Sequence, residues 1–435
     1  SFLVETVEQL ESLRYCESIS GNLVFQSTSF KTLTEDGAIT CLRSVGQDFI
    51  LYGNLLLADL DGFAKLSSVG GRVEIYGNAA LGDLDGLSNI ESVGGDFIVN
   101  ENLSLKSVRG SPLLEEIEGS LIFHNNRSLE SISGFGSLRV IRGKLEFLDH
   151  LELKDVTGFS DLKKVLGDMV VAGNLELSQF DTMPVLNEVS GDLIFLDNIR
   201  LENPCSFPAL LNLGGGISFQ DNPVLKGLGN FSLLSKIEGD LFVEGNLALQ
   251  DLDGFGALKS ISGDLSLREN PMLKGSGGFS LLTEVGGTVF IQKNSALMDL
   301  AGLSALNSIA AGLVIEENQA LANLDGMIAL SEVGGMFSLS SNSGLVHIDG
   351  LAGLVSVGGI LMIKGNESLQ DIDGLDGLEE LGADITISEN PSLLRVLGLK
   401  ELTQIDGNVY VGMNPSLLEI DVFPKVVSVN GQVTV

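Results

Sequence analysis

Apolar and polar positions recur every 24 residues along almost the whole chain. The period runs without insertion or deletion from Val45 to Ser428. If Val285 to Ser308 are numbered as positions 1 to 24, position 13 is Leu in all sixteen turns and position 10 is Asn in fifteen of them. His150 is the exception at position 10. A period of this length with fixed apolar positions is typical of a solenoid, because a single repeat cannot bury its apolar face alone.

Two kinds of spacing occur within each turn. Positions 5 and 7 are apolar and alternate with other residues, which predicts a half-buried strand. Positions 13, 16, 19, 22 and 1 are apolar at three-residue steps and should also point inward, as in Leu249, Leu252, Phe255, Leu258 and Ile261. Gly recurs at positions 3 and 18 in most turns, where the backbone needs either a special conformation or a close approach that a Cβ would block. The chain is therefore predicted to be mainly β, a right-handed parallel β-helix of about 17 coils.

The Asn at position 10 lies between two inward-facing apolar positions, so its side chain should also point inside. A buried amide has to be hydrogen-bonded. Asn can accept from one layer and donate to the next. The sequence therefore predicts an asparagine ladder through the interior.

The two ends differ from the repeat. In residues 1–18, Val4, Val7, Leu10 and Leu13 recur at three-residue spacing, which predicts a short amphipathic helix that caps the first turn. Residues 19–44 read as an imperfect first coil, and residues 45–435 as the solenoid itself. Val435 falls at position 7, in mid-strand, so we expect either that the chain continues or that this end docks on another molecule, as in head-to-tail stacking.

Three cysteines are few for this length, so disulfides do not hold the whole body together. Cys16 precedes the imperfect coil and Cys41 lies near its end, which predicts a disulfide between adjacent layers. The alternative is two buried thiols. Cys205 has no partner by this reasoning and is expected to be a free thiol.

The repeat resembles a known family. The motif L-x-I-x-x-N-x-x-L is followed by I-x-G-L-x-x-L, here with Leu361, Ile363, Asn366, Leu369, Ile372, Gly374, Leu375 and Leu378. This is similar to the receptor L-domain repeat, a relative of leucine-rich repeats that occurs in the ligand-binding modules of insulin and epidermal growth factor receptors and in fungal cell-wall glycoproteins. The resemblance covers nearly the whole chain and implies an L-domain-like solenoid. Sixteen uniform turns look more like bacterial or protist surface proteins than like a hormone receptor, so no ligand residues are carried over.

The net charge of −33 makes nucleic acid and anionic lipid improbable partners, because both require clustered Lys and Arg. It favours solubility, cation binding or a basic partner. No apolar run reaches the roughly 18 residues that a membrane helix needs, so we expect no direct membrane insertion by this chain.

The best candidate for an interaction surface is position 6, which lies between the two inward residues of the strand and should point outward. It is nevertheless often apolar, which usually marks a surface that something covers. The alternative is that β-branched and aromatic residues simply favour strands. We refer to these residues as the position-6 stripe: Ile50, Ile98, Ile122, Val170, Ile194, Phe242, Phe290, Val314, Met362 and Tyr410.

Repeated D-x-D-G steps suggest a weaker candidate site, for calcium. Positions 15 and 17 should face outward, so adjacent turns place carboxylates about 5 Å apart, and a hard cation would relieve their repulsion. The alternative is that Asp-Gly is good turn chemistry on a solvated face. The residues are Asp59, Asp61, Asp83, Asp85, Asp251, Asp253, Asp371 and Asp373.

The sequence offers few residues for catalysis. The three histidines are scattered, and no nucleophile elbow, phosphate-binding loop or C-x-x-C motif occurs. We therefore expect a protein that is not an enzyme and has no cofactor apart from the calcium hypothesis. Of four N-x-S sequons, three fall on ladder asparagines, so Asn230 is the expected glycosylation site. Between residues 158 and 254 position 18 loses Gly three times, which predicts a local irregularity.

Two functions fit these observations. The first is a non-enzymatic extracellular or cell-surface solenoid that acts as a structural or adhesive rod and can stack head-to-tail into filaments. The second is a receptor-like module that binds a protein or glycan ligand on its flat sheet face. The expected partners are therefore another copy of the chain, another surface protein or a glycan.

Overall fold

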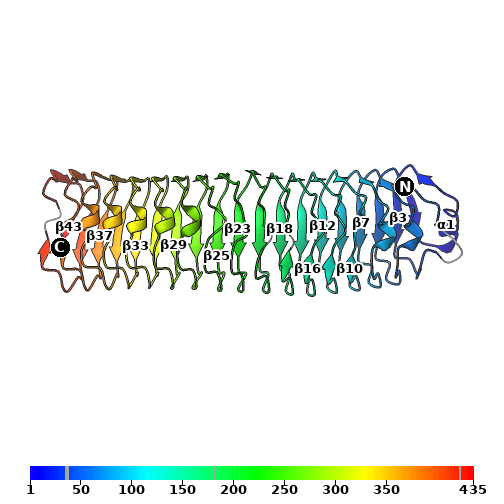
Figure 1. Cartoon of the computed structure of the whole chain (residues 1–435), viewed down its shortest axis with the longest axis horizontal. Coiled ribbons are helices and arrows are strands. Elements are labelled where there is room, and N and C mark those ends of the chain that lie inside the picture. Colours follow the sequence, from blue (N-terminus) through cyan, green and yellow to red (C-terminus); the bar gives the residue numbers. More distant parts are fainter. Residues whose placement is uncertain (35–38, 181, 205, 421–422) are drawn as a thin grey trace. The chain divides into compact units, whose positions relative to one another are not determined.

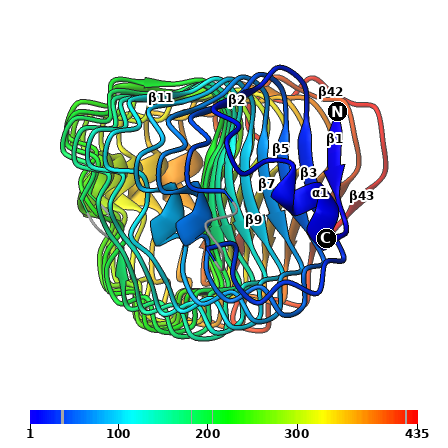
Figure 2. The same ribbon diagram turned by 90° about the vertical axis from the view of Figure 1, so that its right-hand side faces the viewer.

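A computed structural model describes residues 1–34, 39–180, 182–204, 206–420 and 423–435. The chain forms two compact units. Unit 1 comprises Ser1–Gly215 with Gly229–Phe231, and unit 2 comprises Gly216–Leu228 with Ser232–Val435. Within each unit successive turns stack through parallel strands, which lie side by side in Figure 1 and behind one another in Figure 2. The prediction of a mainly β, parallel solenoid is confirmed.

Each unit has one long parallel sheet, to which each turn contributes positions 5 to 8. In unit 1 its strands are β1 (Phe2–Val4), β3 (Leu23–Gln26), β5 (Phe49–Tyr52), β7 (Val73–Tyr76), β9 (Phe97–Asn100), β12 (Leu121–His124), β15 (Leu145–Leu148), β18 (Met169–Ala172) and β21 (Leu193–Leu196). In unit 2 they are β23 (Ile217–Gln220), β25 (Leu241–Glu244), β27 (Leu265–Arg268), β29 (Val289–Gln292), β31 (Leu313–Glu316), β33 (Phe337–Ser340), β35 (Leu361–Lys364), β37 (Ile385–Ser388), β40 (Val409–Gly412) and β43 (Val433–Thr434).

A second parallel sheet is built from two-residue strands at positions 24 and 1. In unit 1 these are β2 (Ser18–Ile19), β4 (Ser44–Val45), β6 (Ser68–Val69), β8 (Ser92–Val93), β11 (Glu116–Ile117), β14 (Val140–Ile141), β17 (Lys164–Val165), β20 (Glu188–Val189) and β22 (Asn212–Leu213). In unit 2 they are β24 (Lys236–Ile237), β26 (Ser260–Ile261), β28 (Glu284–Val285), β30 (Ser308–Ile309), β32 (Glu332–Val333), β34 (Ser356–Val357) and β36 (Glu380–Leu381), followed by the pair β39 (Gln404–Ile405) and β42 (Ser428–Val429).

The third side of the turn takes one of two forms. Short 3-10 helices occur at η2 (Asp61–Phe63), η3 (Asp85–Leu87), η4 (Gly277–Phe279), η5 (Ala301–Leu303), η6 (Asp325–Met327), η7 (Asp349–Leu351) and η8 (Asp373–Leu375). Elsewhere two-residue strands pair instead, at β10 (Ser107–Val108), β13 (Ser131–Ile132), β16 (Asp155–Val156) and β19 (Gln179–Phe180), and at β38 (Arg395–Val396) with β41 (Glu419–Ile420). The segment 158–254, for which a local irregularity was predicted, contains Cys205. This residue lies outside the described residues, so the prediction of a free thiol there is not tested.

The register explains why like side chains stack. Leu313 of β31 pairs with Phe337 of β33, 24 residues further on, and the same offset holds between the paired strands of both long sheets from β5 onward. The three-residue apolar steps are inside as predicted, and Leu249 and Phe255 are fully buried. The interior of each unit is therefore a set of continuous apolar columns, whose close packing stabilises neighbouring turns.

The predicted asparagine ladder is present. Asn174 and Asn246 are fully buried. In a typical rung, the backbone N–H of Asn294 donates to Oδ1 of Asn318 at 3.1 Å, and Nδ2 of Asn294 donates to the carbonyl oxygen of Leu267 at 2.8 Å. Each amide therefore joins the turn before it to the turn after it.

The N-terminal prediction is confirmed in part. A short helix, α1 (Val7–Glu11), is present with a capping box from Thr6 to Gln9, and it lies against β1 (Figure 2). The helix does not extend over residues 1–18, because Phe2–Val4 forms β1 and pairs with β3. Val4 is buried as a strand residue, whereas Val7 is 56% exposed. Three-residue spacing over so few residues did not distinguish a helix from a strand followed by a turn.

The predicted disulfide is wrong, because Cys16 and Cys41 are both free thiols. In the first turn Ser18 pairs with Ser44, 26 residues further on, so the register matches Cys16 with Leu42 and not with Cys41. The thiol of Cys16 instead donates to the carbonyl oxygen of Ser18 at 3.1 Å. Cys41 therefore lies one residue out of register with Cys16.

The glycines at positions 3 and 18 are confirmed as points of close approach. A Cβ on Gly302, at position 18, would lie 1.6 Å from the carbonyl oxygen of Ser276 in the turn before. A Cβ on Gly256 would meet no atom within 4 Å. Gly302 therefore has no room for a side chain, whereas Gly256 does.

We expect Gly302→Ala to lower the free energy of unfolding by about 1–3 kcal/mol, because the new methyl group must push two backbone segments apart. The matched change Gly256→Ala should change it by less than about 1 kcal/mol, and in the stabilising direction through the lower entropy of the unfolded chain. Urea denaturation followed by circular dichroism measures both. Equal destabilisation by the two changes would contradict the steric reason.

Candidate functional site

The position-6 stripe lies on the outer face of the long sheets. In unit 1 it consists of Ile50, Ile98, Ile122, Val170 and Ile194, and in unit 2 of Phe242, Phe290, Val314, Met362 and Tyr410. Nine of these ten side chains are half-buried, and Val314 is 5% exposed. Residues on neighbouring strands are about 4.8 Å apart, so large side chains in this column cover one another and the small ones between them. The stripe is therefore a packed surface rather than a row of free side chains.

The outer face of unit 2 carries a charged cluster around Glu244. Ser266 donates to Oε1 of Glu244, and Gln220 donates to Oε2 at 3.3 Å. Nη1 of Arg268 lies 3.6 Å from Oε1, and the guanidinium carbon lies 3.8 Å from the centre of the Phe290 ring. The ring and the carboxylate thus hold Arg268 in one position, because a cation over an aromatic face is stabilised electrostatically.

A second carboxylate on the same face is held in the same way. Nε2 of Gln292 donates to Oε2 of Glu316 at 2.7 Å, and the hydroxyl of Ser338 donates to Oε1 at 3.0 Å. Glu316 and Gln292 come from position 8, which shares the outer face with position 6. Position 8 is not among the sites predicted from the sequence, although simple alternation along the strand places it on the outer face.

On unit 1 the outer face carries two further groups. The rings of Tyr52 and Tyr76 stack with centroids 5.3 Å apart and planes 9° apart. Nε2 of His124 lies 3.0 Å from Oε2 of Glu146, and Nζ of Lys144 lies 3.7 Å from Oε1 of the same carboxylate. The hydrogen bond from His124 lowers the pKa of Glu146, although burial opposes the shift. These are positioned polar groups without a nucleophile beside them.

The aspartates of the D-x-D-G steps cap turns. Oδ1 of Asp83 accepts from the backbone N–H of Asp85 at 3.0 Å, which fixes the start of η3. Asn323 makes the same bond to the N–H of Asp325 at 3.1 Å, so the turn needs an oxygen acceptor but not a charge. The same bond, at 3.3 Å, joins Asp59 to Asp61, Asp251 to Asp253 and Asp371 to Asp373.

The carboxylates of these steps give little support to the calcium hypothesis. Burial raises the pKa of Asp59 and of Asp373. Nη2 of Arg395 lies 2.9 Å from Oδ2 of Asp373 and therefore relieves part of the repulsion there. In the part of the chain that the structure describes, no group of three or more His, Cys, Asp or Glu is placed to hold a metal ion. Calcium binding stays a prediction from the sequence.

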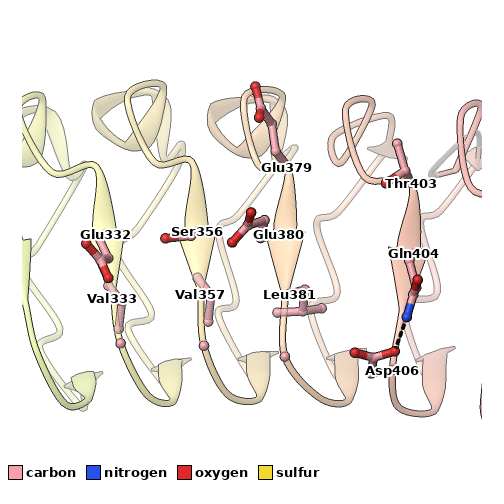
Figure 3. Close-up of a pocket in the computed structure, with 13 residues that line it drawn as sticks. Glu332, Val333, Ser356, Val357, Glu379, Glu380, Leu381, Thr403, Gln404 and Asp406 are labelled. Carbon is pink, nitrogen blue, oxygen red and sulfur yellow. Dashed lines mark hydrogen bonds between the residues drawn. The ribbon is translucent and has the colours of Figure 1, made fainter.

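A shallow pocket of about 400 Å³ lies over the second sheet of unit 2, along β32, β34, β36 and β39 (Figure 3). Glu332, Ser356 and Glu380 lie on three consecutive strands, and Gln404 donates to Asp406 at one end. Glu332 and Glu380 are two strands apart, roughly 10 Å, which is too far to share a proton. The pocket is an acidic surface in which Glu332 and Glu380 do not form a carboxylate pair for acid–base catalysis.

The remaining sequence candidates are placed as follows. The sequon asparagines of the ladder, Asn102, Asn126 and Asn366, are fully buried, whereas Asn230 is exposed. Glycosylation of Asn230 stays a prediction. His150 is buried in the ladder and His124 points outward, so the structure does not bring them together. Among the described residues, no helix combines the length and apolarity of a membrane span.

No protein-family model and no curated protein matches the chain. Among solved structures, the chain is similar to a leucine-rich repeat protein from Bacteroides ovatus ATCC 8483, with 16% identity over 76% of this chain and 75% of that chain and a TM-score of 0.31. It is also similar to TLR13 in the crystal structure of the TLR13–ssRNA13 complex, with 14% identity over 91% of this chain and 84% of that chain and a TM-score of 0.19.

Proposed function

We propose that this solenoid is a binding scaffold and that the outer face of the long sheet in unit 2 binds a partner protein. The observation that carries the proposal is the cluster of Glu244, Arg268 and Phe290. Its charged groups are fixed by neighbouring side chains before any partner arrives, so binding loses little side-chain entropy. Arg and aromatic residues are also the types that contribute most to protein interfaces.

The composition of the face favours a protein partner over a small molecule. Ser266 and Ser338 interrupt the apolar side chains of the position-6 stripe along the sheet, and Glu244 and Glu316 at position 8 border them. This gives an apolar strip with a polar margin, which is the arrangement of a protein interface. A glycan is the alternative occupant, since aromatic and carboxylate groups serve carbohydrates as well. Surface localisation, adhesion, end-to-end assembly and the absence of catalysis stay predictions from the sequence.

The test is affinity purification from the native source with three forms of the full chain. We expect Phe242→Asp with Phe290→Asp to lose at least about 90% of the specifically retained protein, because two charges in the apolar strip remove the central contacts. The matched control is Leu233→Asp with Leu281→Asp, which charges two leucines of unit 2 that are 53% and 48% exposed and lie outside the stripe. Each retained protein is then purified, and its affinity for the three forms is measured.

Circular dichroism has to show the same fold for the three forms. The proposal is wrong if every retained protein binds the stripe variant as tightly as the wild-type chain. A glycan array probed with the same three forms distinguishes the alternative, because loss of glycan binding in the stripe variant alone would assign the face to carbohydrate.

A further inference from the structure

Unit 1 exposes a second apolar column, on the bend that follows each strand of the long sheet. The residue after each ladder position is position 11, and in unit 1 most of these side chains are apolar and exposed. The exposed fractions are 62% for Leu55, 48% for Leu103, 41% for Leu151, 38% for Leu175 and 43% for Ile199. The corresponding positions of unit 2 after Leu247 are Pro, Ser, Gln and Glu. Apart from Leu247, the exposed branched apolar side chains of this column therefore lie in unit 1, and they are not a requirement of the repeat.

Part of this column forms the base of a groove of about 850 Å³. Leu151, Leu175 and Ile199 line it, together with Arg127 at one end. We call it the position-11 groove. Three branched apolar side chains on consecutive turns, each more than a third exposed, are unfavourable in water and favour an apolar occupant.

Acidic residues border the position-11 groove. Glu101, Asp149 and Asp197 lie along it at position 9, and all three are exposed. On the other side, at position 12, are Glu152, which is exposed, and Glu176, which pairs with Arg200 at 3.2 Å. Among the described residues, no Lys, Arg or His nitrogen lies within 4 Å of the carboxylate of Asp149 or of Asp197. An apolar strip between carboxylates is complementary to a segment that is both apolar and basic.

The spacing of the column distinguishes a helix from a strand. Consecutive turns present their position-11 side chains about 4.8 Å apart. A helix laid along the column presents one side chain per turn about every 5.4 Å, whereas an extended strand presents its same-side residues about every 6.6–6.8 Å. Over the three turns of the groove, the helix drifts by about 1 Å and the strand by about 4 Å. A helix therefore stays in register with the leucines.

We propose that the position-11 groove of unit 1 binds a basic amphipathic helix of a partner protein. Its apolar face lies on Leu151, Leu175 and Ile199, and its Lys or Arg side chains lie against the acidic residues on either side. This surface is separate from the outer face of the long sheet, so a negative result for one of the two surfaces does not contradict the proposal for the other.

The test uses the full chain and a labelled synthetic peptide of about 20 residues, built from Leu and Lys with helical periodicity. A second peptide of the same composition has strict two-residue alternation, and a third has Glu in place of Lys. Fluorescence anisotropy near 0.15 M salt measures the three affinities. We expect the helical Lys peptide to bind at least about tenfold more tightly than either of the others.

Two pairs of substitutions locate the binding. Leu151→Ser with Leu175→Ser should weaken binding of the helical Lys peptide at least about tenfold, since it removes the apolar base of the groove. The matched pair is Leu211→Ser with Leu233→Ser, which removes two leucines exposed elsewhere and should change the affinity by less than about twofold. Circular dichroism confirms that both pairs are folded.

Three results would overturn the proposal. Equal weakening by the two serine pairs would mean that the peptide binds acidic surface at large. Equal affinity for the alternating peptide would remove the helical requirement. Unchanged affinity in the variant with Leu151→Ser and Leu175→Ser would mean that the peptide binds elsewhere. Asp149→Asn with Asp197→Asn completes the set, and the proposal requires that it weaken binding and reduce the dependence on salt.

Discussion

Replacing Asn318 by alanine is expected to lower the free energy of unfolding by about 3–5 kcal/mol, more than most single substitutions. Nδ2 of Asn318 donates to the carbonyl oxygens of Ile291 at 2.8 Å and Glu316 at 3.0 Å. Its Oδ1 accepts from the backbone N–H of Asn294 at 3.1 Å. Alanine leaves these groups buried and unpaired, and each such group costs about 1–3 kcal/mol.

The matched control is Asn307→Ala. Asn307 is exposed, and its Nδ2 makes one bond of 3.2 Å to the carbonyl oxygen of Ala329. Water replaces that bond, so we expect a change of less than about 1 kcal/mol. Urea denaturation of both variants gives the comparison. If the two substitutions lower the free energy of unfolding equally, a ladder amide stabilises the fold no more than a surface amide. The physical reason given for the recurrence of Asn at position 10 would then be wrong.

The ladder also shows which parts of the fold can be predicted from the sequence. Position 10 is flanked by inward positions, and a buried amide must find partners, so both its burial and its bonding follow from the pattern. The pairing of Cys16 with Cys41 does not follow, because nearness in adjacent layers does not fix the register, and the register sets Cys16 opposite Leu42, one residue away from Cys41. In the same way, a few apolar residues at three-residue spacing placed a helix where Phe2–Val4 forms β1.

The candidate surfaces were predictable to different degrees. Alternation places the position-6 stripe on the outer face, but it does not reveal that Val314 is covered by its neighbours. The contact between Arg268 and Phe290 joins different columns of adjacent turns, so it depends on side-chain direction as well as on register. The position-11 groove had a signal in the sequence, the leucines that follow the ladder asparagines in unit 1. Those residues lie outside the inward-facing pattern, so the repeat alone does not predict that they form a surface.

His150 interrupts the ladder, and its presence predicts a pH dependence that the asparagines do not have. In the described part of the chain neither ring nitrogen makes a hydrogen bond of good geometry, although the Asn174 amide lies nearby. The ladder asparagine before it, Asn126, keeps its bond from Nδ2 to the carbonyl oxygen of Val99 at 2.7 Å. Burial lowers the pKa of His150 from 6.5 to about 4, and the neighbouring Asn174 opposes the shift only in part. The folded protein therefore holds this imidazole in its neutral form.

The sign of the effect follows from that pKa. Between pH 6.5 and about 4 the unfolded chain binds a proton at His150 that the folded chain does not bind, so stability falls as the pH falls through this window. The full loss is about 3 kcal/mol below the folded pKa, and about 2 kcal/mol of it is already present at pH 5. Above about pH 7.5 the histidine is almost entirely neutral in both states and contributes almost no pH dependence.

We therefore expect His150→Asn to unfold at a higher urea concentration than the wild-type chain, by an amount that grows from pH 7.5 to pH 5 by about 2 kcal/mol. Carboxylates titrate in both proteins and cancel in the difference. His124→Gln is the matched control, since it removes a histidine on the outer face and leaves the buried one in place. A difference between wild-type and His150→Asn that stays constant over this range would mean that the imidazole is reached by solvent. The interior would then be open at this rung, and the turns on either side of His150 would be coupled less tightly than those joined by asparagine.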